Sequence, residues 1–346
     1  MEPTAQLPPQ RDRQLDALRA LAMIHIVCVV HVLYWYDAGG ELARSALLFE
    51  MPCIFVIAGA AQSLGRGVPR LKRLVASRVR RVLLPFYVFL PALYLWLAFM
   101  TFFVPPTVEH HIDIRQFGLA DVVHTALTCC CDKIPNYGYP WFISCYLAVT
   151  CSFPLQARLL RRVPGWAWLA ANAAVVGLLT PVRLPFLENE IKNLPVYNFF
   201  FIAGYLYYRN IRKEALLAVG AVCTALTVWW FVDGVAMPMQ GHKFPADIYF
   251  LVFGTAWVCV LALVFSRVSL PYPPLLRAWN ERGYNIYLWQ IFSAYAVFRI
   301  THLWIGSVSS AAARFAVYFL LTFVFNTVLS RFTYAAERKV LARLGL

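Results

Sequence analysis

The sequence predicts an all-α polytopic membrane protein with about ten transmembrane helices and with both termini in the cytoplasm. Of its 346 residues, 61% are hydrophobic and only 14% are charged, whereas an average soluble domain has roughly 25% charged residues. Apolar runs of about 20 residues, long enough to cross a hydrocarbon core of roughly 30 Å, fill most of the chain. Basic residues occupy the short gaps between these runs.

The formal net charge of +14 follows from membrane topology and does not indicate nucleic acid. If both termini are cytoplasmic, all but eight of the 31 Lys and Arg residues lie on the cytoplasmic side, as the positive-inside rule requires. The eight are Arg44, Arg115, Lys133, Arg183, Lys192, Lys243, Arg299 and Arg314. The sequence has no internal repeat of the kind that many secondary transporters carry.

The transmembrane domain is expected over residues 13–332, between a polar cytoplasmic tail (1–12) and a C-terminal cytoplasmic tail (333–346). The fourth span starts at YPWFISCYL and ends at Arg158, after a loop expected over 105–139. The other spans are expected at 15–37, 44–64, 82–104, 164–182, 195–209, 215–235, 247–266, 283–303 and 311–331. Because the runs at 164–182 and 195–209 are the weakest, the sequence allows nine to eleven spans.

The predicted loop carries residue types that bind metals or form disulfides. His110, His111 and Asp113 match a metal site in residue type only, so we expect a solvated loop and no metal. Cys129, Cys130 and Cys131 have no Cys or His at zinc spacing. The sequence leaves open whether this run forms a disulfide or consists of unpaired thiols.

The first predicted span, RQLDALRALAMIHIVCVVHVLYWY, sets two histidines among apolar residues. An ionisable side chain within the bilayer is costly and therefore indicates a functional site. His31 and Glu50 each lie about six residues from the outer end of their spans, so both are about 9 Å below the outer surface. A carboxylate could orient His31 as a general base, or the two could form a structural polar bridge. His25 lies about 9 Å deeper and on another helix face, and it is the alternative base.

Six pieces of the chain, in order, resemble the acyltransferase-3 family of integral membrane O-acyltransferases. LDALRALAMIHIVCVVH resembles the family's opening LDGLRGLA helix with its closing His. FEMPCIFVIAGA resembles the FFxxSG helix, RVRRVLLP the basic segment that ends in Leu-Pro, and PWFISCYL the W-F-L helix. NFFFIAGYLYYR resembles the FFLxG helix, and RGYNIYLWQIF the SYxIYLxH helix. The match spans nearly the whole chain.

The resemblance implies that an acyl group, often acetyl, moves from cytoplasmic acyl-coenzyme A to a hydroxyl of a sugar, glycan or small molecule. It assigns function to Arg19, to His31, and to a basic segment that here contains Arg78, Arg80 and Arg81. Acyl-coenzyme A is then a co-substrate, and no permanently bound cofactor is expected. Guanidinium groups suit its phosphates, although Arg19 could instead be an interfacial anchor and the basic segment a product of topology.

Two positions depart from the family pattern. Eleven residues separate Arg19 from His31 where the family has ten. A step of twelve positions turns an ideal helix about 120°, whereas a step of eleven returns to within about 20° of the starting face. Either this helix contains a one-residue π-bulge or His31 does not play the family role. The His expected in the IYLxH helix is Gln290, which cannot take up a proton.

The remaining candidates are polar or aromatic residues near the span ends. Tyr287 and Gln290 lie in the inner half of their span and are expected to line the coenzyme channel. The outer-half candidates for the acceptor pocket are Trp141, Asn198, Asp247 and Arg299. Trp141 is also an ordinary interfacial anchor, and Arg299 could pair with Asp247.

The sequence therefore predicts a multi-pass O-acyltransferase of a bacterial inner membrane, with His31 as general base or transient acyl carrier. Its partners would be acyl-coenzyme A, a hydroxyl acceptor and the lipid bilayer. A further step outside the membrane would need another protein, such as a separate periplasmic acyltransferase. The alternative is a proton-coupled transporter or flippase of a glycan or lipid precursor, in which the same histidines relay protons.

Overall fold

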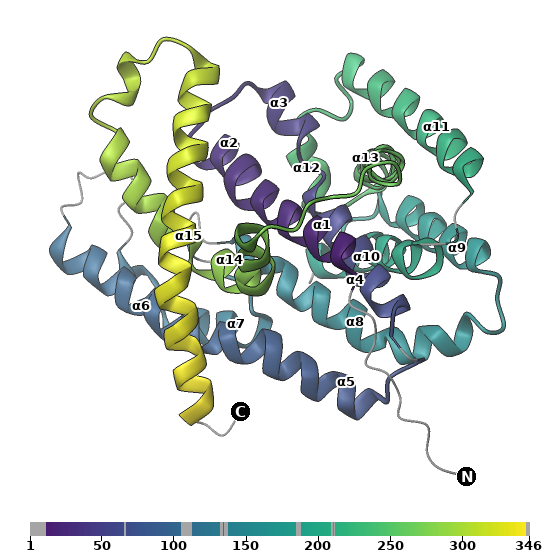
Figure 1. Cartoon of the computed structure of the whole chain (residues 1–346), viewed down its shortest axis with the longest axis horizontal. Coiled ribbons are helices and arrows are strands. Elements are labelled where there is room, and N and C mark those ends of the chain that lie inside the picture. Colours follow the sequence, from purple (N-terminus) through teal and green to yellow (C-terminus); the bar gives the residue numbers. More distant parts are fainter. Residues whose placement is uncertain are drawn as a thin grey trace. The chain divides into compact units, whose positions relative to one another are not determined.

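The computed structural model describes the chain except for residues 1–11, 66, 105–112, 132–133, 135–137, 185–187, 209, 211 and 344–346. The described residues form helices joined by short connections (Figure 1). No strand occurs among them, and one isolated β-bridge joins Lys243 to Ala246. The predicted all-α class is confirmed.

The chain forms two compact units. Unit 1 holds residues 1–30, 39–69 and 153–280, and unit 2 holds residues 31–38, 70–152 and 281–346.

Unit 1 contains α1 (Arg13–Ile24), η1 (His25–Val30), α3 (Glu41–Ala46), α4 (Glu50–Ser63), α9 (Gly165–Leu179), α10 (Glu188–Tyr207), α11 (Lys213–Val232), α12 (Met239–Lys243) and α13 (Ile248–Phe265). Helix α10 packs against α4 and α9, while α13 packs against α4, α9 and α11. Helix α1 packs on α4 through Leu15, Ile57 and Ala60. These contacts fix the positions of the polar residues on α4.

Two glycines allow α4 and α10 to approach closely. A Cβ at Gly59 would overlap the backbone carbonyl of Phe201, and a Cβ at Gly204 would overlap the carbonyl of Val56. Small residues of this kind let membrane helices pack backbone to backbone. The register of α4 on α10 therefore depends on both glycines.

The first helix contains a π-helical segment, η1, between α1 and α2 (His31–Trp35). A π-helical turn holds one more residue than an α-helical turn. Since the segment lies between Arg19 and His31, it accounts for the extra residue that separates them from the family spacing. Of the two explanations that the sequence left open, the π-bulge is the one found.

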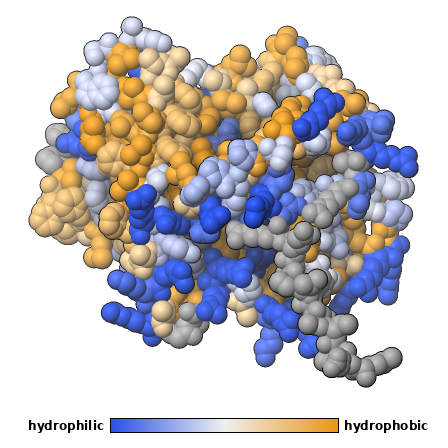
Figure 2. Space-filling view, viewed as in Figure 1, coloured by the Kyte–Doolittle hydropathy of each residue, from blue (hydrophilic) through white to orange (hydrophobic). Residues whose placement is uncertain are grey.

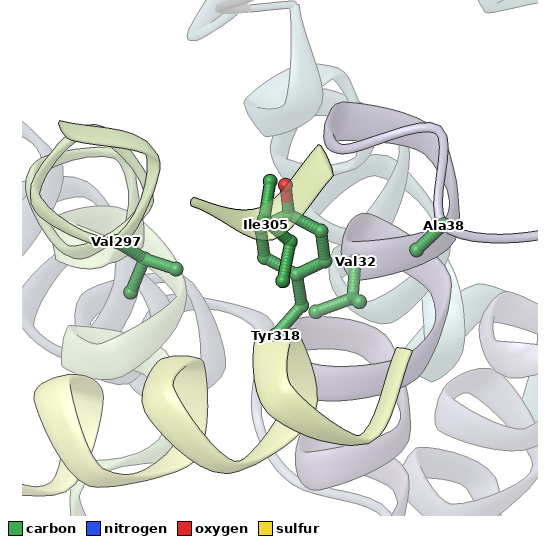
Figure 3. Packing of buried hydrophobic residues seen from close by; sticks show 5 residues of the cluster. All are labelled: Val32, Ala38, Val297, Ile305 and Tyr318. Atoms are coloured by element: carbon green, nitrogen blue, oxygen red, sulfur yellow. The ribbon is translucent and has the colours of Figure 1, made fainter. Parts of the chain in front are cut away.

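Unit 2 contains α2, α5 (Leu71–Arg78), η2 (Val79–Leu83), α6 (Leu84–Phe103), η3 (Ile114–Gln116), α7 (Leu119–Thr128), η4 (Tyr139–Trp141), η5 (Ile305–Ser307) and α15 (Ala311–Arg343), with parts of α8 (Phe142–Leu159) and α14 (Pro274–Thr301). Helix α15 packs against α2 and α6. Val32, Ala38, Val297, Ile305 and Tyr318 form a buried cluster beside α2 (Figure 3). The Tyr36 ring stacks on Tyr318, with ring centroids 4.3 Å apart. This cluster fixes the start of α2, where His31 lies.

Six helices of the described residues are long and apolar enough to cross a membrane. They are Arg13–Trp35, Glu41–Ser63, Leu71–Phe103, Lys213–Val232, Ile248–Phe265 and Ala311–Arg343. Large apolar side chains are exposed on them, and hydrophobic residues cover much of the visible surface (Figure 2). Each of the other four expected spans contains a helix, α8, α9, α10 or α14, that falls short of these criteria. The count of ten thus stays a prediction.

Three boundaries differ from those that the sequence suggested. The expected loop 105–139 contains the amphipathic helix α7. The third long helix begins at Leu71 rather than residue 82, because the basic segment is itself helical. Residues 333–343, expected in a tail, continue α15, and the buried Glu337 accepts a hydrogen bond from Asn285 Nδ2 at 2.8 Å.

The nine cysteines, all within the described residues, are thiols without a disulfide. Burial raises the pKa of the Cys129 thiol to about 11. No group of three or more potential metal ligands occurs among the described residues. Two of the three loop residues considered as ligands, His110 and His111, lie outside that part of the chain.

Substituting Gly204 by alanine should disrupt unit 1, because the new Cβ would overlap the Val56 backbone and force α4 and α10 apart. We expect Gly204→Ala to unfold at a lower temperature in detergent or to fail to accumulate as a monodisperse protein. Gly177→Ala is the matched control, since Gly177 lies in α9 with nothing within 4 Å of its Cβ position. Alanine is the better helix former, so this variant should be at least as stable as the wild type. Equal behaviour of the two variants would contradict the close packing.

Candidate functional site

His31 lies in unit 2, where Gln290 orients its imidazole. The His31 Nδ1 atom is 2.7 Å from Gln290 Oε1. Gln290 Nε2 donates a hydrogen bond to the Tyr287 carbonyl at 2.9 Å, which assigns the amide oxygen to the His31 side. Because that oxygen only accepts, Nδ1 carries the proton, and Nε2 is the basic nitrogen of the neutral ring.

Aromatic residues surround this imidazole. The ring of His31 stacks on Trp35, with centroids 4.4 Å apart. The rings of Tyr139 and Tyr287 each lie 6.1 Å from it. Such a wall limits the positions that the imidazole can adopt and the access of water to it.

The connection that precedes α8 is held against α14 by two tyrosine hydroxyls. Tyr139 donates to the Leu288 carbonyl at 2.6 Å, and Tyr287 donates to the Tyr139 carbonyl. Tyr287 and Gln290, expected in a coenzyme channel, thus lie beside His31. Trp141 ends the short helix η4 and is only half-buried.

Of the three candidate arginines in the basic segment, one points into unit 2 and two are exposed. Arg78 is half-buried, and its Cζ lies 5.4 Å from the centre of the Tyr146 ring. The buried Arg78 Nε has no hydrogen-bond partner in the described part of the chain. Arg80 and Arg81 are exposed on η2. Arg78 is therefore the best placed of the three to bind an anion within unit 2.

Unit 1 contains a cavity of about 1000 Å³ that His25 and Glu50 line. Its walls are mostly apolar residues of α1, α4, α9, α10, α11 and α13. Gln14, near the start of α1, also lines the cavity. His25 lies eleven positions after Gln14, a distance of about 16 Å at the α-helical rise. The cavity thus reaches from the start of α1 to the half-buried imidazole of His25.

A buried ion pair between Lys243 and Glu50 lies at the end of this cavity where His25 is found. Lys243, from α12, donates to Glu50 Oε1, and both side chains are buried. The other carboxylate oxygen, Oε2, is also buried and has no hydrogen-bond partner among the described residues. His25 Nε2 lies 2.9 Å from the Leu47 carbonyl, and its ring stacks on Phe49 at 4.3 Å.

Sequence reasoning did not single out Lys243. The hypothesis that Glu50 orients His31 stays a prediction, whereas Lys243 is the partner that the structure gives to Glu50. Two features of the sequence could have indicated a role for Lys243. It is one of the eight basic residues outside the expected cytoplasmic side, and it lies in the loop that follows the expected span 215–235. A buried carboxylate needs a cation nearby.

Arg19, at the base of the first helix, forms an ion pair with Asp16 at 3.1 Å. The same guanidinium nitrogen donates to Asn280 Oδ1 at 3.3 Å. About a third of the side chain is exposed. Asp16 thus holds one nitrogen of the Arg19 guanidinium, and the exposed part of the side chain can still meet an anion.

Of the other three acceptor-pocket candidates, Asn198 and Asp247 lie in unit 1 and Arg299 lies in unit 2. Asn198 donates to Asn172 Oδ1 at 3.0 Å within unit 1. Asp247 caps the N-terminus of α13 and bonds His242 at 2.6 Å, which raises the His242 pKa because the bond favours the charged ring. Arg299 is exposed in unit 2. The predicted acceptor pocket therefore remains a hypothesis.

The fold and these sites define a helical membrane protein with partnered histidines in its apolar helices. Residues 12–331 match the family model of the acyltransferase-3 acyltransferase domain. The chain belongs to this family of membrane acyltransferases, as its sequence motifs indicated. No curated protein and no solved structure gives a significant match.

Replacing Lys243 by methionine should destabilise the protein by about 3–5 kcal/mol, because it leaves the Glu50 carboxylate buried without its cation. The double variant Glu50→Gln/Lys243→Met should be less destabilised than Lys243→Met alone. Reversible unfolding in mixed micelles measures the stability of the wild type, Glu50→Gln, Lys243→Met and the double variant. Lys213→Met, at an exposed position in the first turn of α11, is the control and should change stability by less than about 0.5 kcal/mol. Additive effects of the two changes would contradict the ion pair.

Proposed function

We propose that this chain transfers an acyl group, most simply acetyl, from cytoplasmic acyl-coenzyme A to a hydroxyl of a sugar, glycan or small molecule. The enzyme would span a bacterial inner membrane with both termini in the cytoplasm. The family membership supports acyl transfer, and the orientation follows from the distribution of basic residues. The observation that carries the proposal is the hydrogen bond that holds His31 in one tautomer.

In the proposed reaction His31 is the general base. Its Nε2 accepts the proton of the acceptor hydroxyl as the hydroxyl oxygen attacks the thioester carbonyl. The tetrahedral intermediate collapses, the carbon–sulfur bond breaks, and the proton passes from Nε2 to the departing thiolate of coenzyme A. No second acid or base is needed, because the imidazole takes one proton from the acceptor hydroxyl and gives it to the thiolate of coenzyme A.

Gln290 fits this reaction although it cannot titrate. A general base must present its unprotonated nitrogen to the substrate, and the Gln290 oxygen fixes the proton on Nδ1. The carboxylate of a catalytic triad holds its histidine in the same way. The glutamine that departs from the family motif is thus suited to positioning His31.

We assign Arg78, in the unit that holds His31, to the coenzyme phosphates, while the same role for Arg19 rests on the family resemblance alone. The inward Arg78 carries an unpartnered buried Nε in unit 2, and Arg19 stands at the base of the first helix. A guanidinium binds phosphate oxygens in a bidentate manner. Arg80 and Arg81 add positive charge at the surface nearby, which attracts an anionic donor.

His31→Gln should lower the turnover of labelled acetyl-coenzyme A by about 10²–10⁴-fold, the usual contribution of a general base. The assay follows the release of free coenzyme A by protein in nanodiscs. His302→Gln is the matched control, because His302 is exposed beside η5, and it should behave as the wild type. Solute uptake driven by a proton gradient, with no thioester cleavage, would contradict acyl transfer and favour the transporter alternative.

The role of Gln290 makes a separate prediction. Gln290→Leu should lower kcat about 10–100-fold with little change in KM, since the imidazole loses its orientation. Gln290→Glu should retain activity because its carboxylate also accepts from Nδ1. The carboxylate of this variant would stabilise the protonated His31 ring, whereas only the unprotonated ring acts as the base. The rise of activity with pH should therefore move to higher pH. An unchanged pH profile together with full activity of Gln290→Leu would exclude the positioning role.

A further inference from the structure

The cavity of unit 1 takes no part in the reaction proposed for His31, although it contains the two other catalytic candidates, His25 and Glu50. We propose that this cavity is a binding site for a long-chain alcohol, that is, a single-chain amphiphile with a terminal hydroxyl. Its chain would lie along the apolar walls, and its single O–H would donate to Glu50 Oε2, with His25 Nδ1 as the alternative acceptor.

The walls have the composition of a hydrocarbon-binding site. Residues from six helices contribute to them, and most are aliphatic or aromatic, including Leu18, Val56, Phe199, Phe200, Val219 and Val258. The volume of about 1000 Å³ is at the upper end of the range for small-molecule sites. An extended aliphatic chain can occupy such a space, and each methylene that leaves water there favours binding.

The buried end of the cavity offers hydrogen-bond acceptors. Glu50 is only 3% exposed, and its Oε2 has no partner among the described residues. His25 donates through Nε2 to the Leu47 carbonyl, because a carbonyl only accepts, and this leaves Nδ1 of the neutral ring as an acceptor. A buried acceptor without a partner is costly, so a ligand that donates a hydrogen bond is favoured here.

The charges at this end favour an uncharged donor. Lys243 already neutralises Glu50, and both interact electrostatically with the His25 ring. A fatty acid would bring a second carboxylate close to Oε2, and like charges repel. An alcohol supplies the O–H donor without adding charge.

The other end of the cavity provides a polar entrance. Gln14, Tyr208, Asn210, Arg212 and Ser266 line the cavity there, at the start of α1, the end of α10, the start of α11 and the end of α13. Arg212 and Asn210 are exposed. An amphiphile could thus enter from this end with its hydroxyl leading.

Binding of tritiated 1-dodecanol to the full chain in nanodiscs tests the proposal, with empty nanodiscs as the background. We expect saturable binding of one molecule per protein. As a competitor, 1-decanol should bind about 16-fold more weakly than 1-dodecanol. It has two fewer methylenes, and each methylene contributes about fourfold to the affinity. Dodecanoate and 1-methoxydodecane, which carry the wrong charge or lack the O–H donor, should each compete at least tenfold more weakly than 1-dodecanol.

Two tryptophan variants of α11 locate the site. Val219→Trp fills the cavity and should abolish saturable binding, whereas Val222→Trp, on the same helix but outside the cavity lining, should bind as the wild type does. If Val219→Trp does not fold, Ala262→Phe on α13 blocks the same cavity. Because no acyl donor is present, the result is independent of the proposed transfer reaction.

Binding no greater than that of empty nanodiscs would overturn the proposal, as would normal binding by the folded cavity-filling variant. Equal competition by 1-dodecanol, dodecanoate and 1-methoxydodecane would overturn the hydrogen bond from the hydroxyl to an acceptor at the buried end of the cavity.

Discussion

The structure depends on one constraint: a polar group that an apolar helix carries into the membrane needs a hydrogen-bond partner, either from the protein or from a bound ligand. Water is absent there, and an unpartnered group costs several kcal/mol. The first helix carries two imidazoles and satisfies both, since His25 bonds the Leu47 carbonyl and His31 bonds Gln290. The π-helical segment between α1 and α2 lies directly between these two contacts.

The same constraint explains the arrangement of unit 1. Gly59 and Gly204 bring the backbones of α4 and α10 together, which fixes the position of the Glu50 carboxylate. That carboxylate can remain buried because α12 supplies Lys243. One of its oxygens is still unpartnered among the described residues. This is why we regard the adjoining cavity as a binding site rather than a packing defect.

Much of the fold follows from the sequence. Apolar runs of membrane length locate the long helices. The extra residue between Arg19 and His31 left a π-bulge as one of two explanations, and the structure contains a π-helical segment there. The hydropathy pattern does not give the rotation of each helix about its axis. For that reason it could not assign Lys243 to Glu50 or Gln290 to His31. The helix over Leu119–Thr128 was missed because its 10 residues are too few to cross a membrane, so the search for membrane-length apolar runs left them in a loop.

The most direct test of this account is deletion of Val29 from the π-helical segment. If η1 holds one residue more than an α-helix needs, its removal should leave a regular helix with His31 on the face that it occupies now. We predict that this deletion variant folds and keeps its acyl-transfer activity, while deletion of Ala22 from the α-helical part abolishes it. Loss of activity in both variants, with both proteins folded, would contradict the account.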